Sequence, residues 1–247
     1  MPYLARLANK LFNTPLMVSQ NKLNAIVYGL SHRFGFEKEQ LPEGMLISAK
    51  HDKYEFFYKV YNKVAVLEIN GVLCEKGGFN ANSDFVIGYS RIAKTLKELV
   101  NDDSVKAIML VINSPGGEVT GAFQLFDVIK EVNAVKPIYA AVNDLAASAA
   151  YLLASACTSI SVTSTASVGS IGVITCHVDL SKALENQGTK ITPIFAGSHK
   201  ADGNYFTPLS EDVRKNIQKD IDVIYDEFVN CVASVRPICI VTGKHLS

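Results

Sequence analysis

The residues of this chain that could do covalent chemistry are one serine and one lysine, together with two segments that contain glycine. Ser148 stands in "VNDLAASAAYLLASA", a run of small residues where an extended segment turns into a helix. A serine at a helix start often serves as an N-cap. Its alanine neighbours also leave the hydroxyl uncrowded, and the N–H of Ala149 would lie beside an oxyanion formed there. The stretch leaves two interpretations open, a helix cap and a nucleophile.

The segment "VINSPGGEVTGA" places two glycines between an apolar strand and a helix. The Ser-Pro pair predicts a turn, and Gly116 and Gly117 permit backbone conformations that other residues avoid. Such a turn can present free N–H groups to a developing negative charge. The glycines also fit a turn that needs them for geometry alone. No G-x-S-x-G elbow is present, which argues against an α/β-hydrolase.

A serine nucleophile needs a base. The candidates in this chain are His177, His199, Lys200, Asp144, Asp179 and Asp202. Three of them lie together in "FAGSHKADGNYFTPLS", which we expect to be a loop following a strand over "ITPIF". A lysine becomes a base at neutral pH only where burial lowers its pKa. Composition and spacing do not choose between His199 and Lys200.

The hydrophobic pattern predicts a scaffold of alternating strands and helices that would position these segments. The β-rich runs are "KVAVLEING", "AIMLVINS", "KPIYAAV", "SISVTS", "VGSIGVIT" and "TKITPIFAG". Helical spacing of apolar residues between these runs predicts one helix with Ile92, Leu96, Leu99 and Val100 inward and another with Ala122, Phe123, Phe126, Ile129 and Val132 inward. This alternation predicts an α/β fold with a largely parallel sheet.

A long amphipathic helix is expected near the C-terminus. Ser210 is a suitable N-cap, and Glu211 and Asp212 follow it in the first turn, where negative charge is favourable. The residues expected to face inward are Val213, Ile217, Ile221, Ile224, Phe228 and Val232.

Length and composition predict one main domain with an appendage. The chain has 247 residues, of which 48% are hydrophobic and 19% charged, enough for one sizeable core. Residues 1–57 have helix-like spacing around Leu23, Ile26 and Leu30, and we interpret them as a helical arm or prodomain. Residues 58–247 are then the main domain.

The chain has 24 basic and 24 acidic residues, so its net charge gives no indication of nucleic acid or an anionic membrane surface as a partner. Five scattered cysteines without CxxC spacing suggest neither a zinc site nor a disulfide framework, which fits a reducing compartment. The sequence has no apolar run of membrane-spanning length and no signal-peptide core at its start, so we expect a soluble protein without a membrane partner.

Four motifs together resemble the signal peptide peptidase A family of serine peptidases, and its phage head maturation protease branch most. They are "NSPGG", "AASAAYLLASA", "STASVGSIGV" and "GSHKADGN", in the order and approximate spacing of that family. The resemblance covers roughly Val64 to Val235. The N-terminal "FNTPLMV" is also similar to the start of the phage proteins, and the absence of a membrane anchor fits that branch.

The resemblance implies a Ser/Lys dyad, with Ser148 as nucleophile and Lys200 as general base. It also implies that Ser170 orients the lysine and that the backbone N–H groups of Gly117 and Ala149 form the oxyanion hole. The fold implied is the superhelix shared by the Clp protease and the crotonases, assembled as a homo-oligomer. No metal or organic cofactor is implied.

The substrates implied are scaffold and capsid proteins, cleaved in the cytoplasm of the bacterial host, within a procapsid. Alternatives are a peptidase for signal peptides or membrane-protein fragments, an inactive procapsid component, and a crotonase-like acyl-CoA enzyme. A Clp-type Ser/His/Asp peptidase using His177 or His199 with Asp202 is a closer alternative.

Two features depart from the family pattern. Ala149 and Ala150 stand where membrane-bound relatives usually have two glycines. The chain ends in "RPICIVTGKHLS", without a recognisable version of the family's closing segment, and the scaffold extension of some phage proteases is missing. We interpret this C-terminus as truncated or altered, for instance in a decaying prophage, and expect it to weaken folding or assembly.

Overall fold

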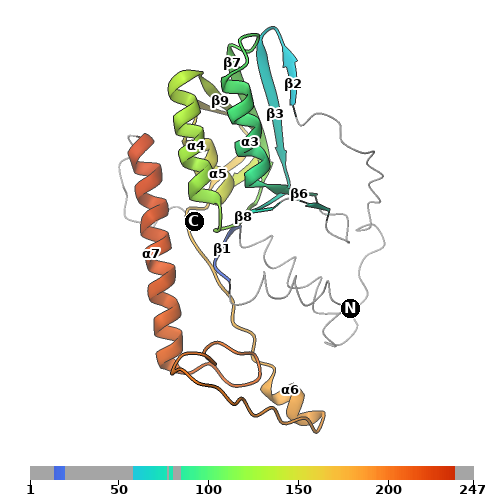
Figure 1. Cartoon of the computed structure of the whole chain (residues 1–247), viewed down its shortest axis with the longest axis vertical. Helices are drawn as coiled ribbons and strands as arrows, with labels where there is room; N and C mark the ends of the chain where they lie inside the picture. Colours follow the sequence, from blue (N-terminus) through green and yellow to red (C-terminus); the bar gives the residue numbers. More distant parts are fainter. Residues whose placement is uncertain (1–13, 20–57, 77, 80–84, 237–247) are drawn as a thin grey trace. The chain divides into compact units, whose positions relative to one another are not determined.

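The computed structural model of the chain describes residues 14–19, 58–76, 78–79 and 85–236. The chain divides into two compact units. We name Met17–Gly172 with Phe228–Ser247 the sheet unit, and Met1–Leu16 with Val173–Glu227 the loop unit. Figure 1 shows the strands gathered in the sheet unit.

The larger sheet of the sheet unit has the strand order β10-β9-β7-β3-β2, with β11 also pairing with β9. Its strands are β2 (Tyr58–Tyr61), β3 (Val64–Asn70), β7 (Ala107–Ser114), β9 (Ile138–Ala147), β10 (Ser159–Val162) and β11 (Ser167–Gly169). All of the pairs are parallel except that of β2 with β3. The prediction of an α/β fold with a largely parallel sheet is confirmed.

The smaller sheet has the order β1-β8-β4-β6-β5. Its strands are β1 (Leu16–Val18), β4 (Val72–Cys74), β5 (Gly78–Phe79), β6 (Phe85–Gly88) and β8 (Gly116–Glu118). β8 follows directly after β7 with one residue between them, so the "NSPGG" segment passes from the larger sheet into the smaller one. The glycines therefore lie where the two sheets of this unit meet.

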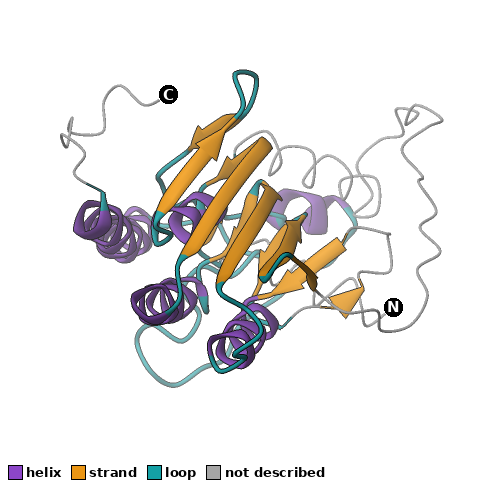
Figure 2. Ribbon diagram, turned by 90° about the horizontal axis from the view of Figure 1, so that it is seen from above, coloured by secondary structure: helices purple, strands orange, loops and turns teal. Residues whose placement is uncertain are grey.

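Helices α3 (Tyr89–Val100) and α4 (Ala122–Val135) pack beside each other over one face of the larger sheet (Figure 2). Their buried residues recur at helical spacing, as predicted, with two corrections. On α3, Val100 was expected to face inward but is only half-buried. Leu125 is buried on α4, whereas Phe123, which was expected to face inward, is only half-buried. Leu125 therefore takes the place of Phe123 on the buried face of α4, while the other four residues predicted for this face are buried.

The third helix, α5 (Ala149–Ser155), joins β9 to β10 and completes a β-α-β unit with parallel strands. Six of its seven residues are buried. The small side chains of the alanine run allow this close packing between the helix and its neighbours. Ser148 is the residue at which β9 ends and α5 begins.

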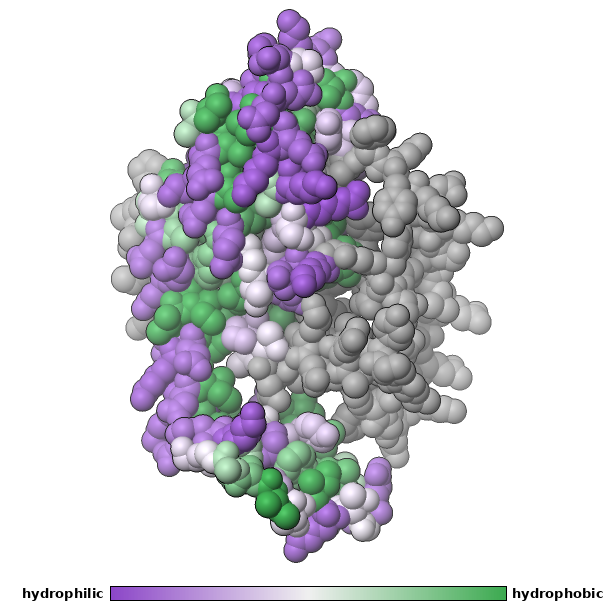
Figure 3. All heavy atoms as spheres, viewed as in Figure 1, coloured by the Kyte–Doolittle hydropathy of each residue, from purple (hydrophilic) through white to green (hydrophobic). Residues whose placement is uncertain are grey.

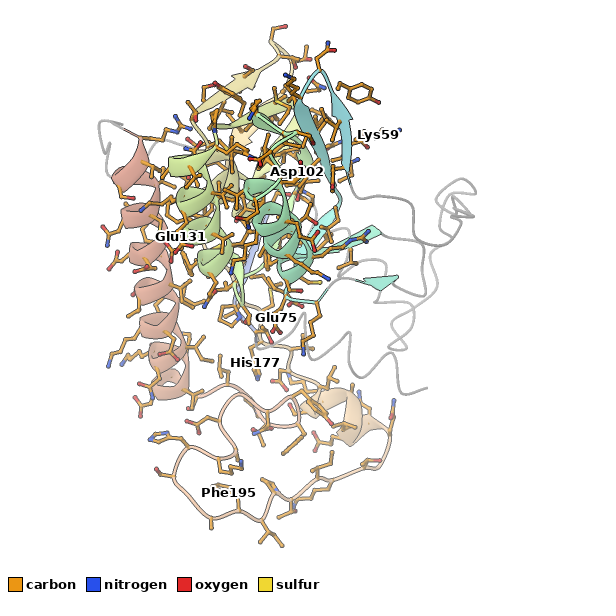
Figure 4. The ribbon with its side chains drawn as sticks, turned by 45° about the horizontal axis from the view of Figure 1, so that its top comes forward. Lys59, Glu75, Asp102, Glu131, His177 and Phe195 are labelled. Atoms are coloured by element: carbon orange, nitrogen blue, oxygen red, sulfur yellow. The ribbon has the colours of Figure 1, made fainter. Side chains whose placement is uncertain are left out.

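The loop unit contains α6 (Ser181–Asn186), irregular segments and the first part of α7 (Glu211–Val235). The prediction of a strand over "ITPIF" is wrong, since residues 189–195 form no strand. The side chains there are exposed, with Ile194 at 97% and Phe195 at 53%. Figure 4 shows Phe195 on this extended segment. A strand needs a neighbour for its backbone N–H and C=O groups, and no strand of the described chain pairs with this one.

The "VGSIGVIT" run is also only partly a strand. β11 ends at Gly169, and an isolated bridge between Leu16 and Ile174 is the remaining pairing in this run. Residues between the two points follow an irregular path because Gly169 and Ser170 both adopt positive φ angles, which a regular strand excludes.

The long helix α7 begins as predicted. The Ser210 hydroxyl accepts a hydrogen bond from the N–H of Val213 at 3.3 Å, which confirms the N-cap. The predicted inward face is the least exposed one, but only Phe228 and Val232 on it are buried. The positions up to Ile224 belong to the loop unit and are half-buried.

Of the predicted arm, residues 1–57, the structure describes only residues 14–19. Leu16–Val18 form β1, so this part is a strand and not a helix. Residues 20–57, which include the helical spacing around Leu23 and Leu30, lie outside the described residues, as does the departing C-terminus after Arg236. The boundary at residue 57 stays a prediction.

Candidate active site

Ser148 has an unusual backbone conformation, with φ 55° and ψ −120°. Its N–H donates to the carbonyl of Gly169 at 2.7 Å, and its own carbonyl accepts from the N–H of Leu152 at 3.0 Å. The hydroxyl makes no capping hydrogen bond to α5. The cap interpretation of Ser148 is therefore wrong, although the residue stands at the cap position.

The Ser148 side chain faces the "VGSIGV" segment. Its Oγ donates to the carbonyl of Gly172 at 3.4 Å, while its N–H is held by Gly169. Ser170 lies between these two contact residues, with a φ of 55°, and is exposed. Ser170 thus lies between two residues that contact Ser148, and its role in orienting Lys200 stays a prediction.

Burial of Ser148 differs from the open approach that its alanine neighbours suggested. The residue is 1% exposed, and Ala147 and Ala149 on either side are also buried. The residues around Ser148 are therefore closely packed.

Gly116 lies beside the backbone on either side of Ser148, at Ala147 and Ala149. A Cβ on Gly116, whose φ is +97°, would be 2.1 Å from the carbonyl oxygen of Met17 and 3.1 Å from the backbone nitrogen of Ala149. A Cβ on Gly117 would be 1.8 Å from the carbonyl oxygen of Leu73. Both glycines are therefore required for close approach, Gly116 to the backbone of Met17 and Ala149 and Gly117 to the backbone of Leu73.

The loop that carries Lys200 belongs to the loop unit, whereas Ser148, Ser170, Gly117 and Ala149 belong to the sheet unit. The pairing of Lys200 with Ser148 therefore stays a prediction. Lys200 is exposed within the loop unit, whereas a lysine that acts as a base must be desolvated.

His199 and Asp202 form a hydrogen bond within the same loop. The distance from His199 Nδ1 to Asp202 Oδ2 is 2.8 Å, and the two side chains are 74% and 33% exposed. The carboxylate accepts the Nδ1–H of the ring, which leaves Nε2 as the atom able to take a proton. This is the contact that a Ser/His/Asp peptidase would require of its histidine.

Asn204 organises the Lys200 loop, and sequence reasoning did not single it out. Its side chain accepts hydrogen bonds from the N–H of Phe206 and the hydroxyl of Thr207, and donates to the carbonyl of Ala201 at 2.7 Å. Its carbonyl oxygen lies 2.8 Å from Nε2 of His177, which Figure 4 marks in this unit. The signal for Asn204 was its place in "GSHKADGN", but only the folded loop gives it partners.

The chain matches two protein-family models. Residues 130–245 match Peptidase family S49, and residues 86–167 match Clp protease. The first match includes Ser148, Ser170 and Lys200, and the second includes Gly117 and Ser148. These matches confirm the resemblance drawn from the four motifs, and the chain is related to the S49 peptidases.

Curated relatives support the same assignment. The chain is 35% identical over 249 residues to "Head-tail preconnector protein GP5" of Enterobacteria phage P21, covering 94% of this chain and 49% of that protein. It is 34% identical over 248 residues to "Capsid assembly protease C" of Escherichia phage lambda, covering 95% and 56%. "Putative signal peptide peptidase SppA" of Enterococcus faecium is 33% identical over 178 residues, covering 70% and 51%. The chain thus spans about half the length of these relatives.

Among solved structures, an enoyl-CoA hydratase from Polaromonas sp. JS666 overlaps with 45% of this chain and 49% of its own, at 18% identity and a TM-score of 0.37. An overlap of this size adds nothing to the assignment. In the part of the chain that the structure describes, no helix combines the length and the apolarity needed to cross a bilayer.

Proposed function

We propose that this chain is the peptidase part of a phage head maturation protease, a serine endopeptidase with Ser148 as its nucleophile. One observation carries the proposal: the hydroxyl of Ser148 does not cap its helix, and the residue stands in a strained conformation beside a glycine turn. The likeness to the phage capsid protease over 95% of this chain supports the same reading.

In the proposed reaction, Ser148 Oγ attacks the carbonyl carbon of a peptide bond while neutral Lys200 takes the hydroxyl proton. The oxyanion that forms accepts hydrogen bonds from the N–H groups of Gly117 and Ala149. Lys200 then returns the proton to the leaving amine as the C–N bond breaks. Water hydrolyses the acyl-enzyme in a second round of the same steps.

The exposure of Lys200 sets a condition on this mechanism. An exposed ammonium group keeps its proton, whereas a lysine that acts as base must be desolvated. We therefore propose that Lys200 is covered when a substrate binds or when a homo-oligomer assembles. Ser170 is proposed to orient it there.

A Ser/His/Asp mechanism is the second candidate, because the His199–Asp202 contact at 2.8 Å already has the geometry that it requires. In that mechanism His199 Nε2 takes the proton from Ser148 Oγ, and Asp202 holds the ring in the correct tautomer. Lys200 would then have no role in proton transfer. The two mechanisms share the nucleophile and differ in the base.

The proposed substrates are scaffold and capsid proteins, because the relative from phage lambda is a capsid assembly protease. The proposed place of action is the cytoplasm of the bacterial host, in or near a procapsid. A peptidase for membrane-protein fragments has the same site and differs only in substrate. A crotonase-like enzyme would not use Ser148 as nucleophile, and an inactive capsid component would tolerate its loss.

The experiment that tests the proposal is covalent labelling of the purified chain with a fluorophosphonate. Such a probe phosphonylates activated serines, because the serine Oγ forms a bond to phosphorus as fluoride leaves. We therefore expect one adduct per chain, located by peptide mass mapping at Ser148. Ser155, which is also buried but donates to the Leu152 carbonyl, is the internal control and should remain unmodified. Absence of label on Ser148 would exclude both peptidase mechanisms.

A further inference from the structure

The C-terminal end of α5 is held by a side chain from far along the chain. Arg236 follows the last residue of α7, and its Nη2 donates to the carbonyl of Cys157 at 2.5 Å. Its Nη1 donates to the carbonyl of Thr158 at 3.3 Å. All of these residues belong to the sheet unit. One guanidinium group thus binds two successive carbonyl oxygens at the junction of α5 and β10.

These carbonyls need an external donor. The last carbonyl groups of a helix and those just after it have no partner within the helix, and they carry the negative end of the helix dipole. The last turn of α5 contains no basic residue. Asn133 donates to the carbonyl of Ala156 at 3.4 Å, which leaves those of Cys157 and Thr158 to Arg236. The cation therefore stands where the dipole favours positive charge.

The Cys157 thiol does not compete for this cation. Burial raises the pKa of the Cys157 thiol to about 12, so the group stays neutral. Nε of Arg236 is itself buried and without a hydrogen-bond partner in the described part of the chain. Burial of a guanidinium with one unsatisfied donor costs free energy. The two hydrogen bonds from Arg236 to the carbonyls of Cys157 and Thr158, just after α5, offset this cost.

The opposite end of α5 carries the proposed nucleophile. Seven residues at 1.5 Å each make this helix only about 10 Å long, so that a displacement of one end is felt at the other. Ser148 and Ala149, proposed to supply Oγ and an oxyanion donor, stand at the first turn. On the last turns of α7, which lead to Arg236, Phe228 and Val232 are buried.

We propose that Arg236 is a positioning residue, which acts through α5 to hold Ser148 and the N–H of Ala149 in the geometry for attack. The inference rests on the proposed function and extends it, since neither the four motifs nor the substrate chemistry involves Arg236. It makes the C-terminal end of α7 part of the catalytic apparatus.

The test compares Arg236→Ala with Arg236→Lys and with a control on the same helix, Arg214→Ala. Arg214 forms an exposed ion pair with Glu211 at 2.7 Å and lies in the first turn of α7. The rate of fluorophosphonate labelling at Ser148 is measured for each variant and divided by the folded fraction. Hydrogen exchange of the amides from 149 to 158 is followed in parallel.

For Arg236→Ala we expect labelling to slow by about 10- to 100-fold, the scale of loss that small misplacement of a reacting group produces. Peptide hydrolysis should lose kcat with an unchanged KM, and exchange at the end of α5 should rise. Arg236→Lys, which keeps the charge and one donor, should recover part of the rate. Arg214→Ala should label like the wild type.

Labelling of Arg236→Ala at the wild-type rate per folded molecule would overturn the inference and leave Arg236 a purely structural residue. Absence of label on the wild-type chain would instead overturn the proposed function. If the alanine variant does not fold, Arg236→Gln keeps the size and one amide donor but removes the charge. Wild-type labelling of that variant would overturn the inference equally.

Discussion

At the scale of single residues, Ser148 combines a strained backbone with an uncapped helix start. Its positive φ with a ψ of −120° is a region that non-glycine residues rarely occupy, at a cost of about 1–3 kcal/mol. Such cost is retained where function requires it. The strain and the lost capping bond together favour a catalytic role over a structural one.

Ser148→Ala should abolish peptide hydrolysis while keeping the fold, because the change removes one hydroxyl and keeps the Cβ. Ser148→Gly should also be inactive but more stable than the alanine variant by roughly 1 kcal/mol, since glycine accepts a positive φ. Chemical denaturation measures the second effect. Retained hydrolysis in either variant would contradict the nucleophile assignment, and equal stability would contradict the strain.

Lys200→Ala and His199→Ala separate the two mechanisms. If Lys200 is the base, its loss should lower kcat by roughly 10²- to 10⁴-fold, the usual contribution of a proton-transfer group, while His199→Ala should lose much less. Steady-state hydrolysis of a peptide substrate by both variants gives the ranking. The reverse ranking would assign the proton transfer to His199 with Asp202.

At the scale of elements, the junction of β7, β8 and α5 is the most constrained part of the site. Gly116→Ala should lose both stability and activity, because the new Cβ would meet the Met17 carbonyl at 2.1 Å and the residue must keep a φ of +97°. Gly188→Ala is the matched control, since its φ is +71° but no atom lies within 4 Å of the added Cβ.

The control variant should lose only the backbone cost of about 1 kcal/mol that a left-handed conformation imposes, with activity unchanged. Thermal unfolding and the labelling rate at Ser148 measure the two effects. Wild-type labelling in Gly116→Ala would show that the turn tolerates a wider separation from Ala149 than the structure indicates.

At the scale of the whole molecule, a long stretch of the chain has no core of its own. Between Thr158 and Glu227 no residue is buried, and Ile191, Ile194 and Phe195 are exposed at 40%, 97% and 53%. Figure 3 shows apolar surface among polar surface in the described part of the chain. Exposed apolar side chains in such numbers often mark a protein contact.

We expect the folded chain to form a homo-oligomer in which this stretch is covered, and light scattering of the purified chain measures its mass. Ile194→Ser should shift the distribution toward the monomer, because it removes an apolar side chain from the most exposed position. Val135→Ser is the control, on α4 and 74% exposed in the sheet unit. A monodisperse, stable and fully active monomer would contradict the expectation.

The sequence alone determined the elements whose patterns are local. The alternating apolar residues of β3, the spacing along α3 and α4 and the Ser210 cap each depend on neighbours within a few positions, and the structure confirms them. The four motifs indicated the family and the candidate residues. Where a strand required a partner, as in "ITPIF", the local pattern was insufficient and the prediction failed.

Only the tertiary structure decided which groups meet around the candidate site. Cys157 and Arg236 are 79 positions apart, and the contact between them depends on how α7 returns to the sheet unit. The hydroxyl of Ser148 does not cap α5 and instead donates a hydrogen bond to the carbonyl of Gly172, which lies 24 positions away. Such contacts follow from the packing of distant elements, because a local pattern specifies which face a segment buries but not the partner that it finds there.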